Sequence, residues 1–258
     1  MFLSKSANLI RDIRGLDKKF TRETAKIALI YVAHGQEDES AIFRNKTASK
    51  TYTDFVAALG WPVHLSTHYG YKGGLETNMM NDGIASYFCT STQEVIFHDI
   101  VGMVTDPNDP KQLKKKRHIG NDHVHIVWNE HATTKYKNDT IGGDFGNAQI
   151  VITPLTSGWY KIDVYRDSGG HVLPFGILRS GAIVPQLALA PLVRFTALSA
   201  YRNAITAGSE FSILSHPYEG RKEAIEIIAS RHGLGTRTFE AYMNQIMTEP
   251  AKETIGVA

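Results

Sequence analysis

The segment that most constrains the fold is residues 25–33, which read AKIALIYVA. It is short, rich in aliphatic and β-branched side chains, and ends at His34-Gly35, which is typical of a buried β-strand. Short apolar runs alternate with segments of helical periodicity along the rest of the chain. Further strands are predicted at 63–67, 87–89, 95–99, 124–128, 148–153 and 159–166, and helices at 52–59, 111–118, 191–205 and 217–229. This mixture predicts an α/β protein with a mixed sheet flanked by helices.

The domain organisation is less strongly marked. The chain of 258 residues has no long linker, internal repeat or low-complexity tract, and its length suits one large domain or two small ones. Apolar residues at helical spacing predict a short N-terminal amphipathic helix that packs on the body of the protein. We expect a smaller N-terminal α/β subdomain over residues 1–83 and a larger unit over residues 84–258 that includes the C-terminal helices.

Charge and cysteine content argue against several classes of protein. The 28 Lys and Arg residues nearly balance the 26 Asp and Glu residues, so the formal net charge is +2. A charge this small gives no general attraction to nucleic acid or to a membrane surface. Cys89 is the single cysteine and cannot form an internal disulfide, and the longest apolar run, 27–33, is far shorter than the ~20 residues that span a bilayer. We expect a cytoplasmic protein that neither binds nucleic acid nor inserts directly into a membrane.

The sequence lacks the motifs of most familiar catalysts. It contains no G-x-x-x-x-G-K-[ST] phosphate loop, no G-x-G-x-x-G, no H-E-x-x-H, no paired C-x-x-C and no G-x-S-x-G. His118, His123, His125 and His131 lie close together in sequence, but no acidic or cysteine ligand joins them at a recognisable spacing. We therefore predict no metal site.

The densest polar run is residues 114–122, KKKRHIGND, in a helix that Asp109 can cap. Lys114, Arg117, His118 and Asn121 fall at i, i+3, i+4 and i+7, so they share one helix face. Cations, an imidazole and a carboxamide on one face suit an anionic, phosphate-bearing partner. From residue types alone, the simpler alternative is a solvated basic helix followed by a turn. Nucleic-acid binding is a further alternative, although no aromatic side chains interleave this run to stack on bases.

Residues 115–122, KKRHIGND, resemble the signature of the Rap/Ran-GAP type of GTPase-activating domain. Other segments fit the tuberin branch of this family, in a fungal-like variant, in the same order along the chain. They are KIALIYV at 26–32 followed by Gly35-Gln36, YTDF at 52–55, YKGGL at 71–75, IVWN at 126–129, TIGGDF at 140–145 and VITPL at 151–155. The resemblance covers about residues 24–166.

The resemblance implies a GTPase-like α/β catalytic subdomain beside a smaller subdomain that dimerises some relatives, so a homodimer is one expectation. It implies a fragment of a much larger protein that activates a Rheb-like or Rap-like small GTPase and works with a hamartin-like partner, with recruitment to the lysosomal or vacuolar surface. The chain would have no cofactor of its own, because GTP and Mg²⁺ belong to the GTPase. It would not be a stand-alone enzyme, because it completes the active site of its partner.

Mapped onto this sequence, the asparagine thumb of the family is Asn121 and its functional histidine is His118. The predicted contacts with the GTPase are Lys114, Lys115, Arg117 and Asp122. A carboxamide has an acceptor oxygen and two donor hydrogens, so it can hold the attacking water while it touches a phosphate oxygen. The alternative is a non-catalytic module of the same fold that only binds a GTPase or a scaffold.

Overall fold

The computed structural model describes residues 6–19, 21–131, 136–142, 146, 148–166, 176–207, 217–233, 240, 243–244 and 247. The chain forms two compact units, one made of Arg22–Leu214 and the other of Met1–Thr21 with Ser215–Ala258. The predicted boundary at residue 83 falls inside the larger unit. The chain does not divide there, because strands from both sides of that position pair in one sheet.

The larger unit is built on a mixed eight-stranded sheet with the order β2-β3-β4-β1-β5-β6-β7-β8. Its strands are β1 (Glu23–Val32), β2 (Trp61–His64), β3 (Ile84–Cys89), β4 (Gln93–Asp99), β5 (Val124–Asn129), β6 (Ala148–Pro154), β7 (Trp159–Arg166) and β8 (Ala182–Pro185). The central strands β4, β1, β5 and β6 are parallel, and the outer strands are antiparallel. This confirms the predicted α/β class with a mixed sheet. β1 is central and buried on both faces, which explains its nearly continuous apolar sequence.

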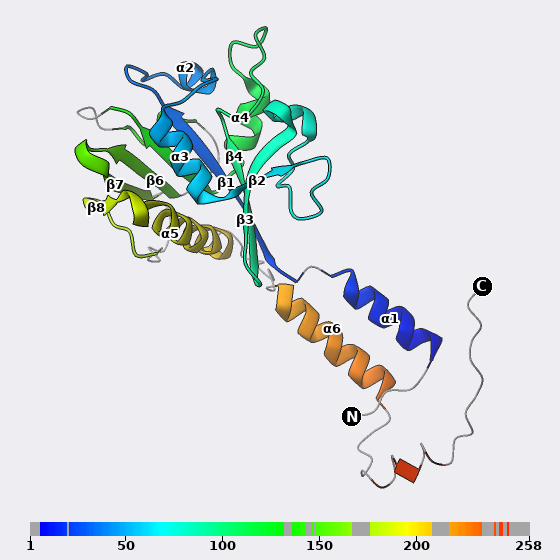
Figure 1. Cartoon of the computed structure of the whole chain (residues 1–258). Coiled ribbons are helices and arrows are strands. Elements are labelled where there is room, and N and C mark those ends of the chain that lie inside the picture. The colour runs from blue at the N-terminus through cyan, green and yellow to red at the C-terminus, as the bar shows by residue number, and fades with distance from the viewer. Residues whose placement is uncertain are drawn as a thin grey trace. The chain divides into compact units, whose positions relative to one another are not determined.

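Helices cover both faces of this sheet (Figure 1). They are α2 (Glu39–Phe43), α3 (Lys50–Leu59), α4 (Leu113–Ile119) and α5 (Gln186–Ala207), with 3-10 turns η1 (Thr77–Met79), η2 (Asn81–Gly83) and η3 (Thr156–Gly158). On one face, α3 and α5 contribute Phe55 and Val193 to the core. On the other face, α2 and α4 contribute Phe43 and Ile119. Ile119 is the last residue of α4, so the core fixes the end of this helix where the predicted site begins.

The predicted long helix near the C-terminus begins earlier than expected. α5 begins at Gln186, so Pro191 lies inside the helix instead of at its start. The added turn buries Leu189 and Ala190 in the core, and this packing outweighs the poor fit of a proline in the second helical turn. Within the described part of the chain, no helix is long and apolar enough to cross a membrane.

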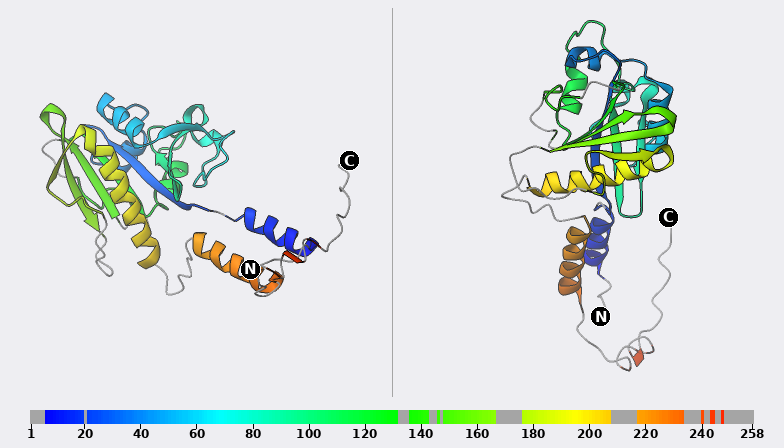
Figure 2. Two further views of the ribbon diagram at one scale, coloured as in Figure 1. Left: turned by 60° about the horizontal axis from the view of Figure 1, so that its bottom comes forward. Right: turned by 90° about the vertical axis from the view of Figure 1, so that its left-hand side faces the viewer.

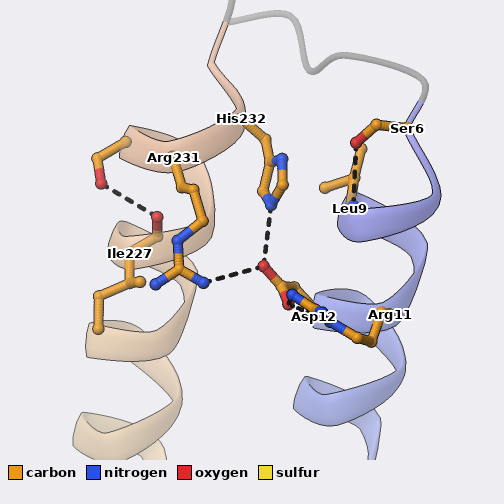
Figure 3. A network of polar contacts seen from close by, with 8 residues as sticks. Ser6, Leu9, Arg11, Asp12, Ile227, Arg231 and His232 are labelled. Atoms are coloured by element: carbon orange, nitrogen blue, oxygen red, sulfur yellow. Dashed lines mark hydrogen bonds and ion pairs between the residues drawn. The ribbon is translucent and has the colours of Figure 1, made fainter.

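In the smaller unit, α1 (Ala7–Asp17) lies beside α6 (Pro217–His232), as both views in Figure 2 show. The carboxylate of Asp12 joins the two helices: it accepts hydrogen bonds from His232 Nε2 at 2.9 Å and from Arg231 Nη1 at 3.2 Å (Figure 3). The hydrogen bond from His232 is the main cause that lowers the pKa of Asp12. The N-terminal helix is therefore confirmed, and its observed packing partner is α6.

Candidate functional site

The predicted basic helix is shorter than expected and begins later. α4 follows Gln112, which has a left-handed backbone with φ of 48°. Asp109 nevertheless binds the helix entrance, because its Oδ2 accepts a hydrogen bond from the Leu113 N–H at 2.7 Å and its Oδ1 accepts one from the Lys111 N–H at 3.0 Å. The bond to Leu113 satisfies an amide group at the start of α4 that has no partner within the helix, and the bond to Lys111 holds the turn before it.

Asn121 lies two residues beyond α4, in a turn closed by a hydrogen bond from its N–H to the His118 carbonyl at 3.2 Å. Its side chain is exposed. Nδ2 donates to the Arg117 carbonyl at 2.7 Å, whereas Oδ1 has no hydrogen bond to any residue that the structure describes. The Asn121 backbone carbonyl accepts a hydrogen bond from Lys26 Nζ at 2.9 Å. The exposed residue thus has a backbone held by Lys26 and a side-chain acceptor without a partner in the described structure.

Asp122 is fully buried directly after this exposed asparagine. Its Oδ1 lies 3.2 Å from Lys26 Nζ, and its Oδ2 lies 2.7 Å from His98 Nδ1. Lys26 and His98 come from the adjacent parallel strands β1 and β4. The carboxylate therefore ties the turn to the sheet. The predicted contact of Asp122 with a GTPase does not fit this position, because the side chain reaches no surface.

Lys115 is also placed differently from its predicted role. Its ammonium is buried and donates hydrogen bonds to the Ile100 carbonyl at 2.7 Å and to Thr105 Oγ1 at 2.9 Å. Burial lowers the pKa of Lys115 to about 8. The side chain joins α4 to the segment after β4 and is not available to a partner. Among the predicted cations, Lys114 and Arg117 are the exposed ones.

His118 is half-buried, and its ring lies edge-to-face against the ring of His98 with centroids 5.3 Å apart. Burial, helped by the neighbouring His98, lowers the pKa of His118 to about 4. The imidazole is therefore neutral near pH 7. A neutral ring that packs against another ring suits a role in orienting the turn better than a role as a cationic contact.

We expect the low pKa of His118 to be visible in both titration and stability. Between the ordinary histidine pKa of about 6.5 and the folded value of about 4, the unfolded chain binds more protons than the folded chain. The contribution of His118 to stability is thus present above this window and is lost as the pH falls through it. NMR titration of the ring nitrogens should give a midpoint near 4. A midpoint close to 6.5 would contradict the observed burial.

A groove of about 740 Å³ lies beside α4. Lys114, Arg117, His118 and Asn121 all line it, so the structure assembles the face predicted from their spacing. The groove lining also includes three acidic residues, Glu76, Asp106 and Asp109. It therefore presents a carboxamide and two exposed cations beside carboxylates, which suits a charged protein surface as a partner.

Sequence reasoning missed Lys26 and His98 as parts of the site. Each lies in a strand more than twenty residues from Asn121. Lys26 begins the family segment at 26–32, but the resemblance gave it no role, and His98 lies in none of the matched segments. The sequence feature that could have identified them is the presence of a charged or polar residue within an otherwise apolar strand. Two of the four histidines considered for a metal site, His125 and His131, lie 3.0 Å and 3.2 Å from backbone carbonyls through Nε2. In the described ranges, no group of three His, Cys, Asp or Glu side chains is placed to hold a metal ion.

The model of the Rap/ran-GAP family matches residues 42–226, which include α4 and Asn121. The chain belongs to the Rap/Ran-GAP family. The family resemblance read from the sequence is therefore confirmed.

Two groups of known proteins are similar to this family member. The chain is 42% identical over 246 residues to human Ral GTPase-activating protein subunit alpha-1 and 39% identical over 246 residues to mouse Ral GTPase-activating protein subunit alpha-2. Both alignments cover 95% of this chain but only 12% and 13% of the relatives, so the chain spans a small part of their length. The structure of the TSC2 GAP domain matches with a TM-score of 0.64 and 28% identity, over 71% of this chain and 98% of that one. The last match confirms the likeness to the tuberin GAP domain.

Proposed function

We propose that this domain supplies Asn121 in trans to a Ral-type small GTPase and thereby stimulates GTP hydrolysis. The observation that carries the proposal is an exposed carboxamide at a groove, on a backbone held by Lys26, in a member of a family of GTPase activators. An exposed side chain on a rigid backbone is what insertion into a neighbouring active site requires.

The chemistry of the amide fits this task. GTP hydrolysis needs a water molecule in line with the γ-phosphate and compensation of the charge that develops there. Asn121 Oδ1 can accept a hydrogen bond from that water, and Nδ2 has a second hydrogen for a phosphate oxygen or the GTPase backbone while the first stays on the Arg117 carbonyl. Docking therefore does not need to break the hydrogen bond that orients the amide.

The exposed cations beside Asn121 support contacts with acidic groups on the partner. Lys114 and Arg117 are exposed on the same groove and can attract negative charge, which raises the rate of encounter at low ionic strength. His118 stays neutral at pH 7 and packs on His98, so we assign it to orientation of the turn and not to proton transfer. Phosphoryl transfer needs little help from a general base in any case.

Ral is our first choice of substrate class because the Ral GTPase-activating alpha subunits match 95% of the chain at 42% and 39% identity. Rheb, which the tuberin branch implies, is the second candidate, because the TSC2 GAP domain shares the fold at 28% identity. A hamartin-like partner and a homodimer stay predictions.

A single-turnover assay with a panel of GTPases tests the proposal. Ral, Rheb and Rap would each be loaded with GTP and mixed with substoichiometric amounts of this chain, and phosphate release would be followed. We expect stimulation of Ral to exceed that of Rheb and Rap, with each domain discharging many GTPase molecules. Stronger stimulation of Rheb would make Rheb the substrate in place of Ral, and the proposed role of Asn121 would stand. Binding to the GTPases without turnover would favour the non-catalytic module instead.

A further inference from the structure

One buried side chain contacts the residues on both sides of Asn121. His98, at the penultimate position of β4, has no exposed surface. Its Nδ1 lies 2.7 Å from Asp122 Oδ2, one residue after Asn121, and its ring packs on His118, three residues before Asn121, at an interplanar angle of 85°. A single residue of the sheet thus fixes the turn at two points.

The hydrogen bond also fixes the tautomer of this histidine. Asp122 is an acceptor, so His98 Nδ1 carries the proton and donates it. Nε2 of His98 is buried and has no hydrogen-bond partner in the described structure. The other Asp122 oxygen faces Lys26, whose ammonium also binds the Asn121 carbonyl. The chain of contacts runs from β4 to the backbone of the thumb.

The segment that covers His98 leaves no space for rearrangement. Gly73 lies over the ring with φ of +61°, and a Cβ atom at this position would stand 2.8 Å from His98 Nε2 and 2.5 Å from Ile96 Cγ2. Such distances lie well inside van der Waals contact, so only glycine permits this approach. The ring is therefore held from above by Gly73, from the side by His118 and through Nδ1 by Asp122.

We propose that His98 is a positioning residue for the Asn121 thumb, acting through Asp122 and His118 without touching the GTPase. This inference rests on the proposed function of Asn121. Its physical basis is that a carboxamide must meet a water and a phosphate oxygen at hydrogen-bond distances. A displacement of about 1 Å in such a group can cost roughly 100-fold in rate.

Two substitutions separate the two contacts. His98→Phe keeps a ring of similar size against His118 but removes the donor to Asp122. His98→Asn can keep a donor near the place of Nδ1 but removes the ring that packs on His118. The matched control is His64→Asn, at an exposed position at the end of β2. Circular dichroism checks the fold of each variant, and hydrogen exchange of the amides of residues 119–123 reports on the turn independently of activity.

We expect His98→Phe to lower the maximal stimulated rate by roughly 100-fold, with little change in the concentration of domain that gives half-maximal stimulation. We expect a smaller loss for His98→Asn, no loss for His64→Asn, and faster exchange at residues 119–123 in both His98 variants. If His98→Phe does not fold, His98→Asn decides alone. In an Asn121→Ala background, neither His98 substitution should reduce the residual rate further, because the group that it positions is gone.

Three results would overturn the inference. They are an unchanged rate in folded His98 variants, a change confined to half-saturation, or a full additional loss in the Asn121→Ala background. The proposed function fails separately, if Asn121→Ala keeps the full stimulation. If Asn121→Ala lowers the stimulated rate but the His98 variants keep it, the positioning role of His98 is wrong and the role of Asn121 stands.

Discussion

Replacement of Asn121 by alanine is expected to reduce the stimulated rate of GTP hydrolysis by about 10³-fold, the lower end of the range for a catalytic group supplied in trans. The lower end applies because a carboxamide brings no positive charge to the developing charge on phosphate. Affinity for the GTPase should change little, because the amide contributes to the transition state more than to docking. Single-turnover phosphate release at saturating domain, together with a binding titration, measures the two quantities separately.

Two further variants make this result specific. Asn8→Ala removes an exposed asparagine on α1, in the other unit, and should leave the rate unchanged. Asn121→Asp nearly preserves the shape of the side chain but sets a negative charge against the phosphate, so it should be as deficient as Asn121→Ala. Wild-type activity in either Asn121 variant would show that the thumb assignment is wrong.

Replacement of Asp122 by alanine is expected to lower the free energy of unfolding of the larger unit by about 3–5 kcal/mol, the cost of removing one partner from a buried ion pair. The variant leaves Lys26 without its carboxylate and His98 Nδ1 without its acceptor, and both groups stay largely shielded from water. The chain has three tryptophans, at positions 61, 128 and 159, and all lie in this unit. Their fluorescence during denaturant unfolding therefore reports on it.

The control for this measurement is an exposed ion pair in the same unit. On the surface of α3, Asp54 Oδ2 lies 2.6 Å from Lys50 Nζ, and 43% of the Asp54 side chain is exposed. Asp54→Ala should cost less than about 1 kcal/mol, as exposed pairs generally do. Equal effects for Asp54→Ala and Asp122→Ala would mean that the buried carboxylate does not anchor the turn as the contacts indicate.

Local patterns predicted much of the fold and part of the site. The apolar run at 25–33 marks the central strand because a parallel strand covered on both faces must be apolar almost throughout. The spacing of Lys114, Arg117, His118 and Asn121 placed them on one face, and all four line one groove. The turn that follows α4 roughly keeps the helical spacing, so the prediction holds for Asn121 although this residue lies beyond the end of the helix.

The sequence pattern could not tell which of two chemically similar residues would be exposed and which would be buried. Lys114 and Lys115 are adjacent lysines, yet one is exposed and the other donates to Ile100 and Thr105 inside the fold. Asn121 and Asp122 are also adjacent, yet the asparagine is exposed and the aspartate is buried. Depth depends on which neighbours the chain brings over a residue, and these neighbours come from distant strands and loops.

The sequence by itself determined the α/β class, the central strand, the family and the helical face that carries the carboxamide, because each depends on short-range periodicity or on an ordered set of motifs. The tertiary structure alone decided that the larger unit begins near residue 22, that Lys115 and Asp122 lie inside it, and that Lys26 and His98 meet behind the thumb. The pairing of β1 between β4 and β5 produces these outcomes, since it brings together residues almost one hundred positions apart.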